Sequence, residues 1–443
     1  MPPDTLQFDV FPLRLTDFEL YHIIDDSPKY PGVFPFEIRF RGQLNRDALA
    51  AAWRAALQRH PMLSTRLSGQ IPNAYWIAGK SPELRWCVAD ESSCHESPAF
   101  DLRCEPPLRA HVSAGVEQFS LKMLFHHACC DGVGALRFVE DLLLAYDQNV
   151  TQPSSGPHWP PLNIERLHVR GEFGLRGYRP KLVDFYNVAV VWFRLMFRRL
   201  VVVQPRNGMA AVDPNVRYSP WAFSEAWLTR QQCNGLRQLA QRSGVTLNDL
   251  MIRALYLTIA DWNGKVSRRW MRITIPTNLR LEEDAAMPAT NVLGFAFLER
   301  RVGRDHDSQG LLQSIHEQMI AVKRGRLGLL FVAGLGIMCR FPRLMRWVLS
   351  RDLTFTTAVL SNLGTPLSGS PLACHDQQIV SGGATVEAIV CVPPLRRNTH
   401  VSIATMTHAG QLIVVLLADP TRFDQMQRVS FLEMYVSRLI KID

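Results

Sequence analysis

A strand, a polar turn and a long amphipathic helix follow one another between residues 119 and 146, and this unit constrains the fold most. In the strand Phe119–Phe125 every second residue is apolar, as in a strand with one buried face. The turn reads His126-His127-Ala128-Cys129-Cys130-Asp131-Gly132, and apolar residues then recur every three or four positions up to Tyr146. Asp131 lies where a helix N-cap is expected. The unit predicts a helix packed on a sheet, with two histidines held at the end of a strand.

The rest of the chain alternates short strands with amphipathic helices in two series. The first series has a strand over 34–40, a helix capped by Asn45 that ends before Pro61, and short strands over 74–77, 84–88 and 108–112. A loop is expected over 148–170. The second series has a strand over 224–228, a helix capped by Thr229, a helix over 246–262, strands over 272–276, 293–298, 358–360, 378–380, 389–392, 401–407 and 411–417, and a final helix over 423–440.

The repetition of strand and helix predicts an α/β fold of the α+β two-layer kind, with two similar lobes. The chain has 443 residues, which allows two or three domains. We expect an N-terminal lobe over 1–160, a crossover segment with a basic apolar helix over 161–214, and a C-terminal lobe over 215–443. Each lobe is expected to be a mixed sheet covered by helices.

Composition narrows the class of protein. Hydrophobic residues make up 47% and charged residues 20%, as in ordinary globular proteins. Residues 1–10 have no basic start followed by an apolar run, and no window offers about 18 uncharged apolar residues, so neither a signal peptide nor a membrane span is expected. The nine cysteines are scattered without a CxxC pair at metal spacing, which favours reduced thiols in a cytoplasm.

The net charge of +9 is concentrated in two apolar, arginine-bearing segments. One covers 188–203. The other is the uncharged stretch 327–339, flanked by seven basic residues: Lys323, Arg324, Arg326, Arg340, Arg343, Arg346 and Arg351. Such segments are typical of amphipathic helices that contact an anionic membrane surface, but the same pattern fits helices whose apolar faces are core. No groove-reading motif or aromatic–basic interleaving is present, so nucleic-acid binding is not expected.

Chemistry alone leaves several interpretations of the turn open. A neutral imidazole held at the end of a strand is suited to accept a proton near pH 7, yet two buried structural histidines fit the pattern equally well. A metal site is disfavoured because no third ligand accompanies the histidines. Cys129 and Cys130 fit small core residues better than nucleophiles. Asp131 either orients a histidine ring or, as its helix-start position favours, has a structural role.

The turn resembles the HHxxxDG signature of the CoA-dependent acyltransferase superfamily. This superfamily includes chloramphenicol acetyltransferase, the condensation domains of peptide synthetases, plant acyltransferases, bacterial wax ester synthases and polyketide-associated acyltransferases. Further segments resemble superfamily motifs in the same order: Arg59–Arg66 (R-H-P-x-L-x-x-R), Pro106–Arg109 (G-P-L-x-R), Gly244–Asp249 (G-V-T-x-N-D), Pro276–Arg280 (P-V-N-x-R) and Ser361–Gly364 (S-N-x-G). The resemblance covers about residues 15–440 and is nearest to the wax ester synthase and polyketide-associated branches.

The chain departs from the superfamily pattern in places. Pro106 replaces the usual glycine of the second motif, and the D-F-G-W-G sequence of the plant branch is absent, with Ser381-Gly382-Gly383 in the comparable region. The given sequence carries no adenylation or carrier-protein segment, which favours a free-standing enzyme.

The resemblance implies two chloramphenicol-acetyltransferase-like lobes with an active-site tunnel between them. His127, preceded by His126, would be the general base that deprotonates an acceptor hydroxyl or amine for attack on an acyl thioester. Asp131 would be mainly structural and paired with an arginine, for which Arg280 is the best candidate. Gly132 would permit the close turn into the helix.

Residues of the second lobe are implied to complete the site. Asn362, with Ser361, would position substrate or the oxyanion, whereas Asn248 and Asp249 are expected to cap their helix. Acyl-CoA or an acyl carrier protein would be a co-substrate, with no permanently bound cofactor and no metal.

The implied function is therefore acyl transfer from a thioester to a lipophilic hydroxyl or amine acceptor. The protein is expected to be a cytoplasmic monomer, peripherally associated with membranes if the basic helices contact lipid. The alternative is a non-catalytic, condensation-like module that binds a carrier protein or lipid.

Overall fold

The structure is a computed structural model, and it describes residues 8–88, 97–154, 156, 158–175, 181–206, 216–264, 269–301, 308–325, 327–351 and 353–441. Residues 1–7, Cys94, Arg326 and the predicted boundary between residues 214 and 215 lie outside the described residues. The eight described cysteines are free thiols.

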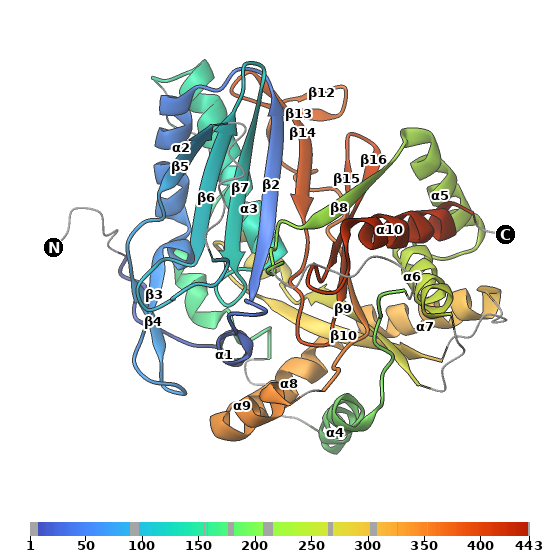
Figure 1. Ribbon diagram of the computed structural model, residues 1–443. Coiled ribbons are helices and arrows are strands. Elements are labelled where there is room, and N and C mark those ends of the chain that lie inside the picture. Colours follow the sequence, from blue (N-terminus) through green and yellow to red (C-terminus); the bar gives the residue numbers. More distant parts are fainter. Residues whose placement is uncertain are drawn as a thin grey trace.

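A seven-stranded sheet forms the first layer of the N-terminal half, in the order β12-β13-β14-β2-β7-β6-β5 (Figure 1). Its strands are β2 (Val33–Arg41), β5 (Leu84–Val88), β6 (Leu108–Ala114), β7 (Gln118–His126), β12 (Cys374–His375), β13 (Gln378–Ser381) and β14 (Ala384–Cys391). Helices α2 (Arg46–Arg59) and α3 (Gly132–Thr151) cover one face. The Asn45 side chain caps α2 by accepting from the Ala48 N–H at 3.0 Å. Trp53 and Phe138 pack edge to face under these helices.

A six-stranded sheet forms the C-terminal half, in the order β10-β9-β11-β15-β16-β8. Its strands are β8 (Phe223–Leu228), β9 (Met271–Asn278), β10 (Leu293–Arg300), β11 (Ala358–Asn362), β15 (Val401–His408) and β16 (Gln411–Ala418). Helices α5 (Arg230–Arg242), α6 (Leu247–Asn263), α7 (Ser308–Arg324) and α10 (Gln425–Ile440) pack on it. The core beneath them is almost wholly aliphatic and aromatic, with Leu250, Tyr256 and Tyr435 fully enclosed.

Four further helices gather at one end of the molecule, at the bottom of Figure 1. They are α1 (Asp17–Asp25), α4 (Leu182–Phe197), α8 (Gly328–Met338) and α9 (Pro342–Ser350); α1 packs on α8 and α9, and α4 packs on α8. A small sheet in the order β1-β4-β3 lies beside α1 and consists of β1 (Leu13–Arg14), β3 (Thr65–Ser68) and β4 (Tyr75–Ala78). Short 3-10 turns cover Pro61–Ser64, Ile164–Val169 and Glu282–Ala286.

The α/β fold with two lobes is confirmed, and one detail of its organisation was not predicted. Strands β12–β14 lie in the C-terminal part of the sequence but join the N-terminal sheet, where β14 pairs antiparallel with β2 from Thr385–Arg41 to Cys391–Phe36. The chain then returns to the other sheet at β15. The interval 215–443 therefore builds strands of both sheets. The predicted loop over 148–170 contains the end of α3 and the 3-10 turn Ile164–Val169.

No single helix in the described ranges is long and apolar enough to cross a bilayer. Helices α8 and α9 reach the required length and hydropathy only when taken together, and the chain bends by 117° between them.

Candidate functional site

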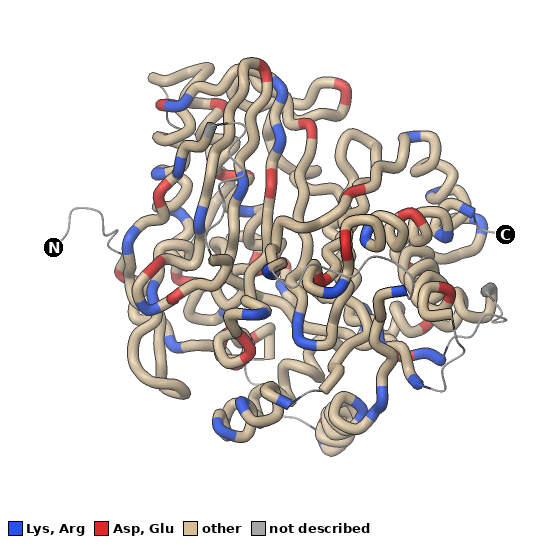
Figure 2. Tube along the Cα trace, viewed as in Figure 1, with Lys and Arg blue, Asp and Glu red and all other residues tan. Residues whose placement is uncertain are grey.

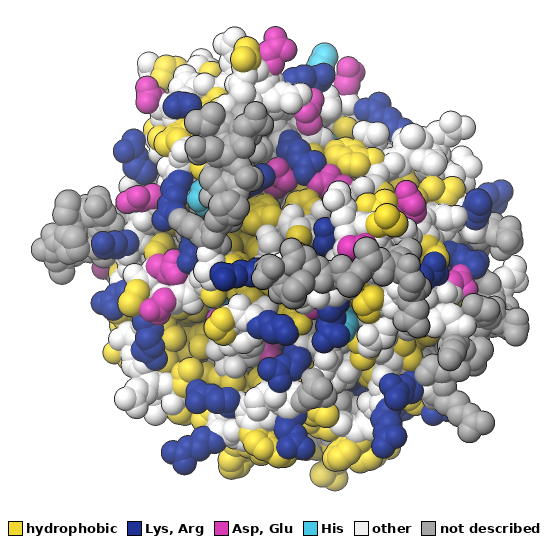
Figure 3. Space-filling view, in the orientation of Figure 1, with side chains coloured by type: hydrophobic (Ala, Val, Ile, Leu, Met, Phe, Trp, Pro, Cys, Tyr) yellow, Lys and Arg dark blue, Asp and Glu magenta, His cyan; other side chains and the backbone are white. Residues whose placement is uncertain are grey.

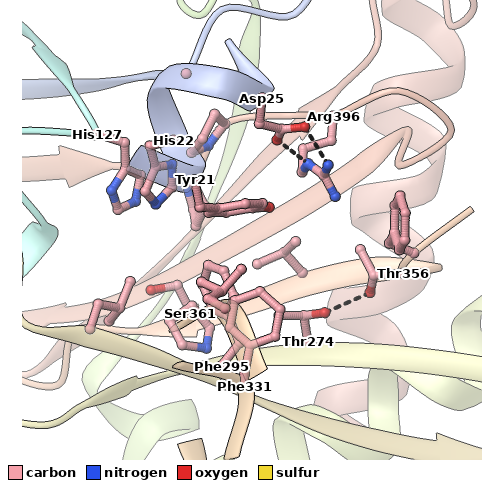
Figure 4. Close-up of a pocket in the computed structure, with 18 of the residues that line it drawn as sticks. Tyr21, His22, Asp25, His127, Thr274, Phe295, Phe331, Thr356, Ser361 and Arg396 are labelled. Atoms are coloured by element: carbon pink, nitrogen blue, oxygen red, sulfur yellow. Dashed lines mark hydrogen bonds and ion pairs between the residues drawn. The ribbon is translucent and has the colours of Figure 1, made fainter. Parts of the chain in front are cut away.

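A cavity of about 210 Å³ opens between the two sheets and the four helices at their end. Figure 4 shows His127 and His22 at one end of it, with Phe295 and Phe331 on the opposite wall. Of the residues singled out in the sequence, four line the cavity and five do not. The lining residues are His127, Gly132, Ser361 and Asn362, and the others are His126, Asp131, Arg280, Asn248 and Asp249.

His127 is held by its backbone from both sides. It follows the last residue of β7, its N–H donates to the Gly32 carbonyl at 2.7 Å, and its carbonyl accepts from the Asn291 side-chain amide at 2.6 Å. The ring stacks on His22 with centroids 4.6 Å apart and planes 4° apart, and lies at 5.0 Å from the Phe34 ring. Its Nδ1 is buried and has no hydrogen-bond partner among the side chains that the structure describes. The backbone hydrogen bonds and the ring contacts hold the ring in the cavity. Because Nδ1 is buried, Nε2 is the ring nitrogen that can contact a substrate.

Burial sets the protonation state of His127. Loss of solvent lowers the pKa of the ring to about 4, against a smaller opposing effect of the nearby Asp131 carboxylate. The ring is therefore neutral at pH 7, which is the form that accepts a proton.

His22 is a cavity residue that the sequence analysis missed. It lies in α1, 105 residues before His127 (127 − 22), and its ring covers that of His127 face to face (Figure 4). Burial lowers its pKa well below the usual value, and the neighbouring His127 and His126 lower it further. A neutral His22 adds no positive charge beside the neutral His127. Local sequence offers no signal for it, because the contact exists only when α1 folds against the end of β7.

His126 faces away from the cavity. Its side chain is fully buried, and its Nδ1 accepts from the Ala128 N–H at 3.1 Å. Its Nε2 lies 3.6 Å from a carboxylate oxygen of Asp26, which itself lines the cavity. These contacts place His126 behind the site rather than in it.

Asp131 ties the start of α3 to the second lobe. One carboxylate oxygen accepts from the Gly134 N–H at 2.7 Å, which caps α3, and the other accepts from the Val292 N–H at 2.8 Å. Arg280 donates to the two oxygens at 2.9 and 3.1 Å, so the ion pair expected for these residues is present. With every lone pair engaged and 1% of its surface exposed, the carboxylate has no capacity left to orient a histidine. The geometry favours the structural interpretation.

Gly132 is the first residue of α3, and its backbone does not lie in the left-handed region. A side chain there would meet Leu363 Cδ2 at 3.1 Å, so the glycine leaves room at the cavity wall rather than permitting an unusual turn.

Ser361 and Asn362 end strand β11 and line the cavity opposite α3. The side-chain oxygen Oδ1 of Asn362 accepts from the Gly364 N–H at 2.9 Å, and the side-chain NH₂ group lies 3.5 Å from Oδ1 of Asn248. Asp249 completes a capping box with Thr246 at the start of α6 and also lies 2.8 Å from His316 Nδ1. The predicted capping role of Asp249 thus fits its contacts, whereas Asn248 contacts a cavity residue.

The cavity extends from His127 into an apolar arm. Its walls are aromatic and aliphatic side chains of β10, α4, α8 and α9: Phe295, Phe297, Trp192, Leu195, Met196, Phe331, Leu335, Met338, Met345, Val348 and Leu349. Polar groups are few and already paired. Asp25 forms an ion pair with Arg396, and Thr274 donates to Thr356 at 2.8 Å (Figure 4). The arm is suited to a hydrocarbon chain.

The remaining candidate groups offer little further chemistry. Burial raises the pKa of Cys129 and of Cys130 well above the usual value, so these thiols stay protonated in the core. Within the ranges that the structure describes, no three His, Cys, Asp or Glu side chains are grouped so as to hold a metal ion.

Part of the chain matches a known family model, and parts of it are similar to known proteins. Residues 289–432 match the WS/DGAT C-terminal domain. An uncharacterized protein of Mycobacterium tuberculosis is 30% identical over 261 residues, which are 57% of each chain. The matched region thus spans little more than half the length of that relative. The phthiocerol/phthiodiolone dimycocerosyl transferase of Mycobacterium leprae is 24% identical over 315 residues, covering 67% of this chain and 71% of the relative.

Solved structures share the fold over nearly the whole chain. The first condensation domain of the calcium-dependent antibiotic synthetase superposes with a TM-score of 0.69 at 14% identity, covering 97% of this chain and 95% of that one. The starter condensation domain of rhizomide synthetase, solved as a mutant with C8-CoA and Leu-SNAC, gives a TM-score of 0.67 at 12% identity, covering 97% and 94%.

Proposed function

The chain belongs to the CoA-dependent acyltransferase superfamily, and on this premise we propose that it transfers an acyl group from a thioester to a hydroxyl or amine, with His127 as general base. The observation that carries the proposal is the neutral His127 ring, fixed by its backbone at one end of a largely apolar cavity between the lobes.

The reaction follows from that geometry. His127 Nε2 accepts the proton of the acceptor hydroxyl or amine as its oxygen or nitrogen attacks the thioester carbonyl carbon. The tetrahedral intermediate then collapses, the carbon–sulfur bond breaks, and the thiolate takes the proton back from the imidazolium to leave as a thiol. General base catalysis of this kind contributes about 10²–10⁴-fold, and alignment of the two substrates contributes further.

The second lobe supplies two polar side chains to the cavity wall. Ser361 and Asn362 end β11 at the cavity wall, where they are suited to position the substrate or the developing oxyanion. Asp131 and Arg280 act indirectly, since their ion pair holds α3 and the residues before β10 in place.

The apolar arm favours a long acyl chain or a lipophilic acceptor. Burial of each CH₂ group of an aliphatic chain contributes about 0.8 kcal/mol, so a longer acyl chain binds this lining more tightly. The donor is acyl-CoA or an acyl carrier protein. The starter condensation domain of rhizomide synthetase, which has a similar fold, was solved in complex with C8-CoA.

The test compares thiol release by the wild-type chain, His127→Ala and His375→Ala. The last is a matched control because the His375 side chain is 87% exposed, in β12. Acyl-CoA donors of increasing length and carrier-protein donors are each supplied with a panel of alcohols and amines. We expect His127→Ala to lose about 10²–10⁴-fold in turnover while keeping its circular dichroism spectrum, and His375→Ala to retain full activity.

Two results contradict the proposal. Unchanged turnover in His127→Ala refutes the general-base role. Absence of turnover in the wild type with every donor refutes acyl transfer and supports the non-catalytic module that binds a carrier protein or lipid.

A further inference from the structure

The outward sides of α4, α8 and α9 form an exposed apolar surface, here called the helical face. Large apolar side chains dominate it: Phe185 is 56% exposed, Phe193 64%, Phe197 71%, Phe341 58% and Trp347 55%. Figure 3 shows hydrophobic side chains gathered along the lower edge of the molecule, where these helices lie in Figure 1. Soluble proteins seldom leave so many large apolar groups together in water, so a partner surface is indicated.

Basic side chains are interspersed with these apolar groups. Arg194 and Arg199 at the end of α4, and Arg340, Arg343 and Arg346 around α9, are all exposed. In the part of the chain that the structure describes, Arg343 and Arg346 form no ion pair. Figure 2 shows the basic residues along α9 and at α4. Their charge therefore remains available to an anionic partner.

The same three helices line the apolar arm of the cavity. On α9, Trp347 is exposed while its neighbours Val348 and Leu349 line the cavity. On α4, Phe193 is exposed while its neighbour Trp192 lines the cavity. The wall between the helical face and the arm is thus a single layer of helix.

We propose that the helical face docks on an anionic lipid bilayer and that the long acyl chain passes from the bilayer between these helices into the cavity. The inference rests on the proposed function, because the arm leads to His127. A bilayer suits the face better than a protein does, since exposed aromatic groups and arginines are interspersed along α4 and around α9, as in helices that lie in the membrane interface. The arginines are attracted to the anionic surface, and salt screens this attraction, so the affinity falls as salt rises.

The binding experiment measures cosedimentation of the full chain with phosphatidylcholine vesicles, with and without about 30% phosphatidylglycerol. The variants are R343E/R346E, L344E/W347E and the control R237E/R242E. The control makes the same charge change on α5, where Arg237 and Arg242 are also exposed, away from the helical face (Figure 1). We expect the wild type and the control to bind anionic vesicles at low salt and to be released at high salt. Each helical-face variant should bind at least tenfold more weakly.

The activity experiment tests the passage of the acyl chain. We expect both helical-face variants to turn over a soluble short-chain thioester as the wild type does, because none of the four residues lines the cavity. Turnover of a long-chain thioester embedded in anionic vesicles should fall at least fivefold in both variants and not in R237E/R242E.

The outcomes separate the two proposals. Vesicle binding that is absent in the wild type, or equal in all variants, overturns the docking surface even if short-chain turnover proceeds. A second result also overturns the bilayer proposal. If the wild type binds an acidic carrier protein but not vesicles, and both helical-face variants lose the carrier protein, the face is a surface for a protein. Vesicle binding without turnover of any thioester leaves the surface standing and refutes acyl transfer.

Discussion

At the scale of single residues, burial rather than a charged partner governs the proposed base. The His127 ring stacks on a second histidine whose pKa is also lowered, and loss of solvent lowers the pKa of His127 more than the neighbouring Asp131 raises it. Asp131, the obvious carboxylate partner in the sequence, is occupied by Arg280 and two backbone N–H groups. The burial of His127 is therefore the main cause of its low proton affinity.

The pH dependence of activity follows from this environment. In the proposed reaction the neutral ring accepts the proton, and burial lowers the pKa of His127 to about 4, so the neutral form persists above that pH. We expect kcat/KM for thiol release to stay level from about pH 8 down to about pH 5 and to fall as the pH drops through about 4. Circular dichroism at each pH serves as the control for acid unfolding. An inflection near the ordinary imidazole value of about 6.5 would show that the ring is solvated and the inference from burial is wrong.

The sequence predicts only the local part of the site. The histidine pair, the helix cap at Asp131 and the glycine after it lie within seven consecutive residues, so their pattern is visible without the fold. His22 and Asn291 reach the same point from α1 and from the segment before β10, and Asn291 is 164 residues from the carbonyl it contacts. Contacts at such separation depend on packing that no local pattern encodes.

At the scale of elements, close helix packing shapes the apolar arm. A side chain at Gly334 of α8 would meet the Trp192 ring of α4 at 1.6 Å from Nε1. The same indole stacks on Phe331 with centroids 5.6 Å apart. Trp192 and Phe331 both line the cavity. The lack of a side chain at Gly334 therefore determines how closely α4 packs on α8 in the wall of the arm.

Substitution of Gly334 tests this packing. We expect Gly334→Val to push the indole away and to lower the free energy of unfolding by about 1–3 kcal/mol, as overpacking usually does. Ala333→Val is the matched control, because Ala333 is the preceding residue of the helix and is exposed. Denaturant unfolding measures the loss, and hydrogen exchange should quicken over α4 in Gly334→Val alone. Equal stability of the two variants would mean that α4 is not packed closely on α8.

Periodicity predicts most elements, and it fails where an element is short or its pairing is distant. The strand Phe119–Phe125, the helices capped by Asn45 and Thr229, and the helix predicted over 246–262 are confirmed; the N-cap of this last helix is Thr246. Helices α1, α7 and α9 were missed. Helices α1 and α9 have only nine residues each, too few turns to establish a clear repeat, whereas α7 has 17. Alternation also predicts strands near 378–380 and 389–392 but not their partner, since the pairing of β14 with β2 depends on the whole fold.

At the scale of the whole molecule, the two lobes share segments of chain and ion pairs, among them Arg39–Glu225 and Arg280–Asp131. β14 completes the N-terminal sheet beside β2, and Asp131 of the first lobe binds Arg280 and the Val292 N–H of the second. Removing one partner of a buried ion pair costs about 3–5 kcal/mol, so this contact alone is a considerable link between the lobes. The predicted lobe over 1–160 is therefore not a self-contained unit of this fold.

Expression of fragments tests that conclusion. In a chain of residues 1–160 the strand β2 loses β14, and a nine-residue, largely buried strand becomes an open sheet edge. Such an edge pairs with other chains, so we expect the fragment to aggregate and to lack a cooperative unfolding transition. The same fragment joined by a flexible linker to residues 372–392, which carry β12–β14, should regain solubility because its edge is paired again. Size-exclusion chromatography and thermal unfolding compare the two. A monomeric fragment 1–160 that unfolds cooperatively would show that the first lobe folds without the strand it receives from the C-terminal half.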